Sequence, residues 1–480
     1  MATFLSTAVL TINAQTSVSG GIYSNTTWTL AGSPYTATAN VIVFPGVTLT
    51  VDPGVIVKFD PAVQLELRQA RLIANGTAGS PISFTSNGST TPGNWDAIFL
   101  NGGTMNDQFN YCNFEYASKA INGSAGDSIV IQNCNFSYNL VGIEVGAAFT
   151  SYGILQNCTF LHNSSVGANN LTGFTVSNCN FALNNTGLFS EYCSIDNCMF
   201  SQNQTGFYGD KDNTLTNCTS TQNYQTGFYC GRACHMENCI STKNQNGIVA
   251  GNTIHDDYAY IKNTIVDSNT VAGITIGNRK DSIFYCQIRY NGTGFIDNNS
   301  DSAWPNVITK NNIESNATGV QIANNTYDSF TCNKICSNTG YDLNYGGTNN
   351  YTFANNYFCT ADAAVPALIY DGYDNPSYGL ITFLPTDSSC SSSVATGIHE
   401  EQGTPFSIFP NPATDHLTLE LSSIDSRTVI RIYNILGALE YSSGITEPRN
   451  DLDISSLSKG IYFIQVNTEK GSVRQKFIKQ

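Results

Sequence analysis

The sequence predicts an all-β protein in which a long solenoid of about fifteen stacked coils precedes a small β-sandwich. Two observations predict the solenoid. A motif of Asn-Cys followed by Phe or a small residue recurs through the middle of the chain about every 20 residues, and the apolar runs are only three to five residues long. Because Asn and Gly interrupt each run, no helix fits between the interruptions. Each repeat is therefore predicted to be a coil of short strands that stacks in parallel on the next.

The residues of the Cys column are predicted to point into the inside of the coils. Cys and the residue two positions later, often Phe, point to the same face of a strand. An apolar residue also stands three positions before each repeat Cys, as at Ile131 and Leu155. The column contains Cys112, Cys134, Cys158, Cys179, Cys198, Cys218, Cys239 and Cys286.

The Asn and Gly columns are predicted to lie at the corners, where the chain turns between strands. Asn tolerates bent or left-handed backbone, and stacked amides can hydrogen-bond from coil to coil. Gly, as at Gly142 and Gly187, suits tight corners. The Asn column contains Asn139, Asn163, Asn184, Asn203, Asn223, Asn244, Asn269, Asn291, Asn316 and Asn338.

The 15 Cys residues favour buried free thiols over a disulfide ladder, because at least eight lie in the inward column. Neighbouring coils lie ~4.8 Å apart, so an isolated disulfide is allowed by distance. Cys230, Cys234 and His235 have the residue types of a zinc site, but they are expected to point in different directions. No metal and no other cofactor is predicted.

Taken in order, the chain divides into four parts. Residues 1–15 read as a signal peptide without its positive start, residues 16–387 as the solenoid with its caps, residues 388–405 as a Ser-rich linker, and residues 406–480 as the β-sandwich. Within the solenoid, residues 41–59 alternate between Pro-Gly turns as short strands do, and residues 361–383 lose the repeat and are expected to cap the last coil. No stretch approaches 18 apolar residues, so no transmembrane helix is predicted.

The repeat columns, together with Gly93-Asn-Trp-Asp-Ala-Ile98, resemble the parallel β-helix of the pectin-lyase-like superfamily in its NosD-like form. The resemblance covers the solenoid and implies that the coils turn in a right-handed sense. Members of this superfamily include polysaccharide lyases and hydrolases. The residue sets of the polygalacturonases and of the calcium-dependent pectate lyases are not present as sets, so the resemblance implies no catalytic residue here.

The last 75 or so residues resemble the type A C-terminal sorting domain of the type IX secretion system of Bacteroidetes, an Ig-like β-sandwich. The residues that carry this resemblance are Pro410, Asn411, Pro412, Gly437, Gly460, Tyr462, Lys476 and Phe477. It implies export by the type IX machinery to the medium or the outer-membrane surface of a Gram-negative bacterium. It also implies a cut by a sortase-like peptidase between Ser391 and Gln402, followed by release or by attachment to lipopolysaccharide.

Charge limits the function and indicates one candidate site. A net charge of −15 with only 12% charged residues argues against nucleic-acid binding, which needs a basic face. One set of charged turns is predicted to stack on a single corner of the solenoid, where it could bind a ligand: Asp210, Lys211, Asp212, Arg232, His255, Asp256, Asp257, Arg279, Lys280 and Asp281. The alternative interpretation is a solvent-exposed corner without a ligand, where opposite charges pair weakly.

The first functional hypothesis is a non-catalytic rod for adhesion or glycan binding. The alternative is a polysaccharide lyase or glycoside hydrolase acting at this corner.

Overall fold

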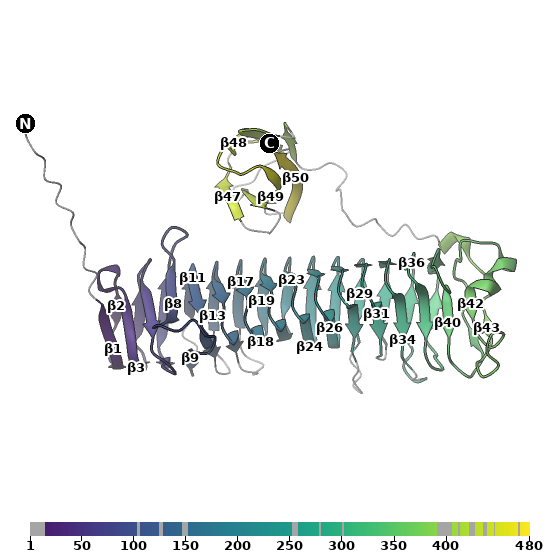
Figure 1. The fold of residues 1–480 in the computed structure, drawn as a ribbon, viewed down its shortest axis with the longest axis horizontal. Helices are drawn as coiled ribbons and strands as arrows, with labels where there is room; N and C mark the ends of the chain where they lie inside the picture. The colour runs from purple at the N-terminus through teal and green to yellow at the C-terminus, as the bar shows by residue number, and fades with distance from the viewer. Residues whose placement is uncertain are drawn as a thin grey trace, which may run out of the picture. The chain divides into compact units, whose positions relative to one another are not determined.

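The structure is a computed structural model that describes residues 15–102, 106–123, 128–145, 152–251, 258–277, 280–299, 302–390, 406–410, 413–421, 428–434, 439–445, 447–468 and 471–480. The chain forms two compact units, Met1–Gly397 and Ile398–Gln480. The first unit is a rod of stacked coils, a parallel β-helix, in which strands of neighbouring coils lie side by side along its length (Figure 1). The solenoid of about 15 turns predicted from the sequence is confirmed.

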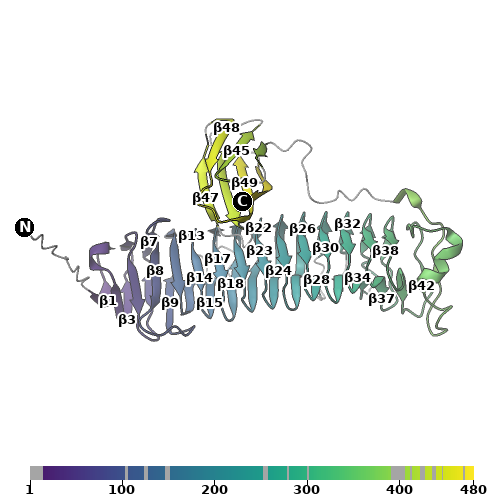
Figure 2. The ribbon, with the colours of Figure 1, turned by 45° about the horizontal axis from the view of Figure 1, so that its top comes forward.

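Each coil contributes a strand to each of three parallel sheets, whose ladders run along the rod in both views (Figure 2). Sheet 1 contains β2 (Thr26–Trp28), β4 (Thr48–Val51), β7 (Arg71–Asn75), β10 (Asp107–Asn110), β13 (Ser128–Gln132), β16 (Tyr152–Gln156), β19 (Phe174–Ser177), β22 (Ser194–Asp196), β29 (Tyr260–Lys262), β32 (Ser282–Phe284), β35 (Val307–Thr309) and β38 (Ser329–Thr331). Sheet 2 contains β5 (Ile56–Phe59), β8 (Ile82–Ser86), β11 (Cys112–Glu115), β14 (Asn135–Ser137), β17 (Thr159–Leu161), β20 (Asn180–Ala182), β23 (Met199–Ser201), β25 (Thr219–Thr221), β27 (Ile240–Thr242), β30 (Ile265–Asp267), β33 (Gln287–Arg289), β36 (Asn312–Glu314) and β39 (Lys334–Cys336).

Sheet 3 carries the candidate site described below. It contains β6 (Leu65–Arg68), β9 (Trp95–Asn101), β12 (Ala117–Gly123), β15 (Val141–Val145), β18 (Val166–Thr172), β21 (Thr186–Glu191), β28 (Asn246–Ala250), β31 (Ala272–Ile276), β34 (Thr293–Asp297), β37 (Thr318–Ile322), β40 (Leu343–Tyr345) and β42 (Ile369–Tyr370). Four longer strands cross a corner. β1 (Thr16–Ile22) and β3 (Tyr35–Val43) span sheets 2 and 3, whereas β24 (Thr205–Thr216) and β26 (Thr226–Glu237) run from sheet 3 into sheet 1.

The inward columns form a continuous core, as predicted. A ladder of stacked Phe rings fills sheet 2, with ring centroids 5.1, 4.6, 4.7, 4.8 and 5.2 Å apart from Phe84 through Phe114, Phe136, Phe160 and Phe181 to Phe200. Stacked and offset rings add attraction to the burial of apolar area. All eight residues of the Cys column are buried free thiols, and Cys193 is a ninth.

The corners follow one rule. A residue in the left-handed conformation precedes a residue whose side chain turns inward, as Tyr138 (φ 56°) precedes Asn139. The Asn139 amide Nδ2 donates to Asn163 Oδ1 (3.0 Å) and to the Phe114 carbonyl (3.1 Å), and the same pattern repeats along the column. The predicted amide ladder is therefore confirmed, whereas the left-handed residue is the one before each Asn. At Gly142, an added Cβ would collide with the Gly167 carbonyl oxygen, which explains the Gly column.

Three disulfides lie outside the column of free thiols: Cys230–Cys234, Cys332–Cys390 and Cys336–Cys359. The expectation that Cys230 and Cys234 point in different directions is wrong, because both are buried and bonded to each other. A disulfide removes both thiolates that a zinc site would need.

The repeat ends in a cap that extends beyond the expected residues 361–383 on both sides. It contains η2 (Asp362–Leu368), η3 (Ser388–Cys390) and a small pair of strands, β41 (Tyr351–Thr352) with β43 (Ile381–Thr382). The segment does not leave the solenoid entirely, because β42 still adds a two-residue strand to sheet 3 beside β40. The remaining short helix, η1 (Leu30–Gly32), lies in the first coils.

The second unit is an antiparallel β-sandwich, as predicted. One sheet contains β44 (Phe406–Phe409), β45 (His416–Leu421) and β48 (Arg449–Asp453). The other contains β46 (Val429–Asn434), β47 (Leu439–Gly444), β49 (Gly460–Thr468) and β50 (Gly471–Lys479). A separate apolar core lies between the two sheets, with Leu417, Leu419, Ile432 and Ile464 fully buried.

Candidate functional site

An aromatic ladder lies on the outward face of sheet 3. Phe189 of β21, Tyr208 of β24 and Tyr229 of β26 are register neighbours in consecutive coils. Each follows a fully buried residue in its strand, so alternation along the strand turns it outward. The Phe189 and Tyr208 rings meet edge to face at 5.3 Å, and the Tyr208 and Tyr229 rings stack at 4.5 Å. Tyr208 remains 38% exposed, so the ladder offers aromatic surface to solvent.

Charged side chains lie at the end of the same strands. The Arg232 guanidinium donates from Nε to Asp210 Oδ1 at 3.0 Å and from Nη2 to Asp210 Oδ2 at 2.6 Å, a two-pronged ion pair. Glu191 of β21 lies next to Asp210, and the two carboxyls interact electrostatically. Both partners of the ion pair stay partly exposed, at 25% for Arg232 and 30% for Asp210. We call the aromatic ladder and these charges the β24 patch; its residues are Phe189, Glu191, Tyr208, Asp210, Lys211, Tyr229 and Arg232.

The two carboxyls of the β24 patch have pKa values that move in opposite directions. The hydrogen bonds from Arg232 lower the pKa of Asp210. Partial burial, together with the negative charge of Asp210, raises the pKa of Glu191. Two carboxyls with separated pKa values are the pattern of an acid and a base. However, a glycosidase needs its two carboxyls ~5 Å or more apart around the sugar or water. Here both oxygens of Asp210 are already bound by Arg232.

The structure brings together three of the ten predicted ligand-binding residues, Asp210, Lys211 and Arg232. Lys211 of β24 is the register partner of Arg232, and its Nζ lies 5.6 Å from the centre of the Tyr192 ring. Asp212 is next in the chain, exposed and left-handed (φ 47°). The turn expected at residues 210–212 is instead part of the continuous strand β24. A strand that crosses the corner explains why these side chains align with those of β26.

Lys280 and Asp281 do not join this group. Lys280 Nζ lies 3.6 Å from the centre of the Trp304 ring, a cation–π contact. The expectation that Asp281 lies on an exposed corner is wrong: it is 0% exposed, and its Oδ1 accepts the Ala259 N–H at 2.7 Å. The reason is the corner rule, because the left-handed Lys280 (φ 63°) turns the next side chain inward. His255, Asp256, Asp257 and Arg279 lie outside the described residues.

Sequence reasoning missed four residues of the β24 patch: Phe189, Glu191, Tyr208 and Tyr229. A signal for the aromatic ladder was present. The repeats read Gly-Leu-Phe189, Gly-Phe-Tyr208 and Gly-Phe-Tyr229, so an aromatic stands two positions after the Gly in three successive coils. Since residues i and i+2 share a face and the intervening Leu or Phe is inward, this column was predictable as an outward ladder.

Two of the predicted sorting residues build the core of the second unit. Tyr462 and Phe477 face each other across β49 and β50, with ring centroids 5.6 Å apart, and both are buried. The Tyr462 hydroxyl donates to the Ser458 carbonyl at 2.8 Å. Pro410 follows β44, Gly460 begins β49, and Lys476 lies in β50 opposite Phe463. Asn411, Pro412 and Gly437 lie outside the described residues.

Neither a metal cluster nor a membrane helix appears in the part of the chain that the structure describes. No group of three or more His, Cys, Asp and Glu side chains is arranged to hold a metal ion there. Likewise, none of the helices in those ranges is long and apolar enough to span a bilayer.

Two family models match parts of the chain. Residues 407–480 match the family model of a secretion system C-terminal sorting domain, and residues 20–133 match that of a pectate-lyase like β-helix domain. The chain is thus a β-helix protein with a C-terminal domain that directs it to the type IX secretion machinery. It is secreted or held at the outer-membrane surface. No curated protein matches the sequence significantly.

Several solved structures are similar to the chain. A periplasmic alginate epimerase has 11% identity and a TM-score of 0.33, over 75% of this chain and 84% of that one. The A-module of a mannuronan C-5 epimerase from Azotobacter vinelandii has 13% identity and a TM-score of 0.30, over 73% and 90%. A tailspike protein of an Acinetobacter baumannii bacteriophage, a capsular polysaccharide depolymerase, has 10% identity and a TM-score of 0.26, over 90% and 73%. At these values the similarities carry no argument about what this chain does.

Proposed function

We propose that the rod is an extracellular polysaccharide-binding protein that holds a glycan at the β24 patch without cutting it. The observation that carries the proposal is the three-coil aromatic ladder next to the Asp210–Arg232 ion pair. Aromatic rings offer flat apolar area to the C–H faces of sugars, and the neighbouring charges offer donors and acceptors to their hydroxyl groups. Consecutive coils repeat at ~4.8 Å, so a chain ligand can contact several of them at once.

The charge of the patch is balanced, which favours binding through many weak contacts over the clamping of one charged group. Asp210 and Glu191 face Arg232 and Lys211, two acids against two bases. Arg232 uses its Nε–H and an Nη2–H on Asp210, so it presents a fixed planar group rather than an unpaired cation. The fold also supports adhesion, because a rod that is secreted or surface-held displays its sheets to the medium.

A second candidate function is polysaccharide cleavage at the same patch, as a lyase or hydrolase. The opposite pKa shifts of Glu191 and Asp210 favour it. The ion pair with Arg232 argues against a hydrolase, because the guanidinium already binds both oxygens of the Asp210 carboxyl. Polysaccharide binding is therefore the first candidate function, and polysaccharide cleavage is the second.

The test exposes the purified full chain to a panel of plant and algal polysaccharides and records both binding and the release of reducing or unsaturated ends. We expect binding to at least one polysaccharide with no new ends. New ends that vanish in Asp210→Asn or Glu191→Gln would establish the enzyme instead. New ends that vanish only in an Asp256→Ala/Asp257→Ala double variant would move the chemistry to the second acidic pair of the predicted corner. Absence of binding to every member would contradict the proposal.

A further inference from the structure

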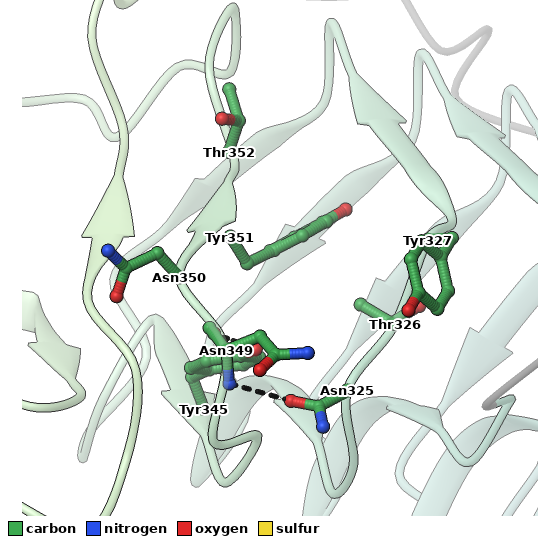
Figure 3. A pocket seen from close by; sticks show the side chains of 8 residues that line it. All are labelled: Asn325, Thr326, Tyr327, Tyr345, Asn349, Asn350, Tyr351 and Thr352. Carbon is green, nitrogen blue, oxygen red and sulfur yellow. Dashed lines mark hydrogen bonds between the residues drawn. The ribbon is translucent and has the colours of Figure 1, made fainter. Parts of the chain in front are cut away.

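A hollow lies near the C-terminal end of the rod, apart from the β24 patch. It opens between the loop from β37 to β38 (residues 323–328) and the loop from β40 to β41 (residues 346–350) and has a volume of about 300 Å³. Small-molecule sites begin at about this size. Figure 3 shows the side chains of Tyr327 and Asn350 at opposite sides of the hollow, with those of Tyr351 and Asn349 between them.

Aromatic rings form much of the lining. Tyr327 is 53% exposed on one side. The rings of Tyr345 and Tyr351 stack with centroids 5.9 Å apart, and Tyr345 itself is buried. The hollow therefore joins one accessible ring to a fixed aromatic base, an arrangement that can receive a flat apolar face.

Hydrogen bonds within the protein hold the two loops in place. The Tyr345 hydroxyl donates to the Asn349 carbonyl at 2.6 Å, and the Asn349 N–H donates to Asn325 Oδ1 at 2.8 Å (Figure 3). On the far side, Asn350 Oδ1 accepts the Leu380 N–H at 2.9 Å. The lining is thus organised without a ligand, which reduces the entropy lost on binding.

The chemistry of the lining selects against anionic ligands. The described side chains around the hollow are Asn, Thr and Tyr, and none of them is cationic. Two carboxyls are buried behind it: Thr326 Oγ1 accepts the Asp328 N–H at 3.1 Å, and the charge of Asp328 raises the pKa of the neighbouring Asp297. The negative charge of Asp328 disfavours an anion in the hollow. Amides and hydroxyls both donate and accept, as sugar hydroxyls do.

We propose that this hollow is a binding site for one unit of a neutral saccharide, with Tyr327 as the ring against which the sugar lies. The site goes beyond the proposed function, because it stands on other residues in other coils of the rod. Its failure leaves the β24 patch untouched, and the reverse also holds.

The experiment titrates the full chain by calorimetry with neutral hexasaccharides of glucose (cello-, malto- and laminari-series) and of mannose, and with hexagalacturonate as the acidic probe. We expect at least one neutral probe to bind more tightly than hexagalacturonate at this site. Tyr327→Ala should weaken that binding at least tenfold, whereas Tyr327→Phe, which keeps the ring, should stay within about threefold.

The matched control is Tyr373→Ala, which removes an 84% exposed ring in the cap outside the hollow and should leave the affinity unchanged. Thermal denaturation of each variant confirms folding. The proposal is overturned if no neutral probe binds, or if neutral binding survives Tyr327→Ala and is lost instead in Tyr208→Ala/Tyr229→Ala.

Discussion

At the scale of single residues, the buried Asn ladder couples each coil to the next. Asn203 is 0% exposed; its Nδ2 donates to the Phe181 carbonyl at 2.9 Å and to Asn223 Oδ1 at 3.1 Å, and its Oδ1 accepts the Asn184 N–H at 2.9 Å. One side chain therefore satisfies polar groups of both neighbouring coils. Buried groups without a partner cost about 1–3 kcal/mol each, so these amides matter more through what they satisfy than through their own bonds.

Replacing Asn203 by Ala should lower the free energy of unfolding by roughly 2–5 kcal/mol, because the Asn184 N–H and the Phe181 carbonyl lose a partner. Urea denaturation followed by circular dichroism measures the change. The neighbouring exposed Gln204 provides the control, and Gln204→Ala should change the free energy by no more than about 0.5 kcal/mol. Equal effects of the two substitutions would show that the ladder is not a source of stability.

A second residue-scale feature is a buried carboxyl in the column that elsewhere holds Ile276 and Ile322. Asp297 is 0% exposed, accepts the Asn299 N–H at 2.8 Å, and faces Asp328 and Tyr351. Burial, reinforced by the charge of Asp328, raises the pKa of Asp297 to about 8. The folded state thus favours the neutral acid. The stability that follows is complete below the ordinary pKa of 3.8 and is lost as pH rises through about 8.

We therefore expect Asp297→Asn to stabilise the rod at pH 9 by on the order of a few kcal/mol and to change little at pH 4. Thermal denaturation of wild type and variant across this range gives the difference as a function of pH. A benefit that is the same at both ends would contradict the assignment of a neutral buried acid. Stabilisation by Asp297→Asn at low pH alone would mean that folding lowers the pKa of Asp297 instead of raising it.

At the scale of elements, the strands of sheets 1 and 2 meet at the column of free Cys residues. Their thiols pack in the core as small apolar side chains do. The nine free cysteines are all buried, and burial raises the pKa of Cys193 and of Cys286 to about 12. Thiolate is the reactive form, so burial limits access to all nine, and the raised pKa further protects Cys193 and Cys286.

Alkylation read by mass spectrometry should accordingly find almost no reactive thiol in the native protein. After unfolding without reductant it should find nine, since the other six cysteines form three disulfides. Fewer than nine would mean disulfides within the column. Rapid labelling of the native protein would mean that the coils open easily.

How far the sequence predicts each element depends on whether the side-chain direction follows from spacing alone. Period and column identity determine the strands, the amide ladder and the thiol column, because i and i+2 share a face along a regular strand. Direction at a corner depends on the backbone of the preceding residue. That is why Asp281 turned inward, and why β24 ran on through residues expected to form a turn. The bonds of Cys332 with Cys390 and of Cys336 with Cys359 require the cap to fold back, which no local pattern encodes.

At the scale of the whole molecule, the two units have separate roles: the sorting domain delivers the rod. Deleting residues 406–480 should retain the rod inside a host that carries the type IX system, which immunoblotting of medium, surface and periplasm would measure. A Tyr462→Ala variant should act in the same direction, because it removes a buried ring from the core of the sorting domain. Normal export of the truncated chain would contradict this role.

The secreted form should also be shorter than the full chain. We expect mass spectrometry of the exported protein to place its C-terminus between residues 391 and 402, as the resemblance to the type IX sorting domain implies. An intact C-terminus at Gln480 would mean that the domain is not removed by a peptidase.

The central claim is that the rod binds a polysaccharide through the β24 patch and leaves it intact. The most direct measurement is the calorimetric affinity of wild type and Tyr208→Ala/Tyr229→Ala for the polysaccharide that the rod binds best, with end groups assayed in the same samples. Loss of two stacked rings should weaken binding about tenfold or more, with Tyr373→Ala unchanged and no new ends. Unchanged affinity in the double variant, or ends that accumulate with time in wild type, would contradict the account.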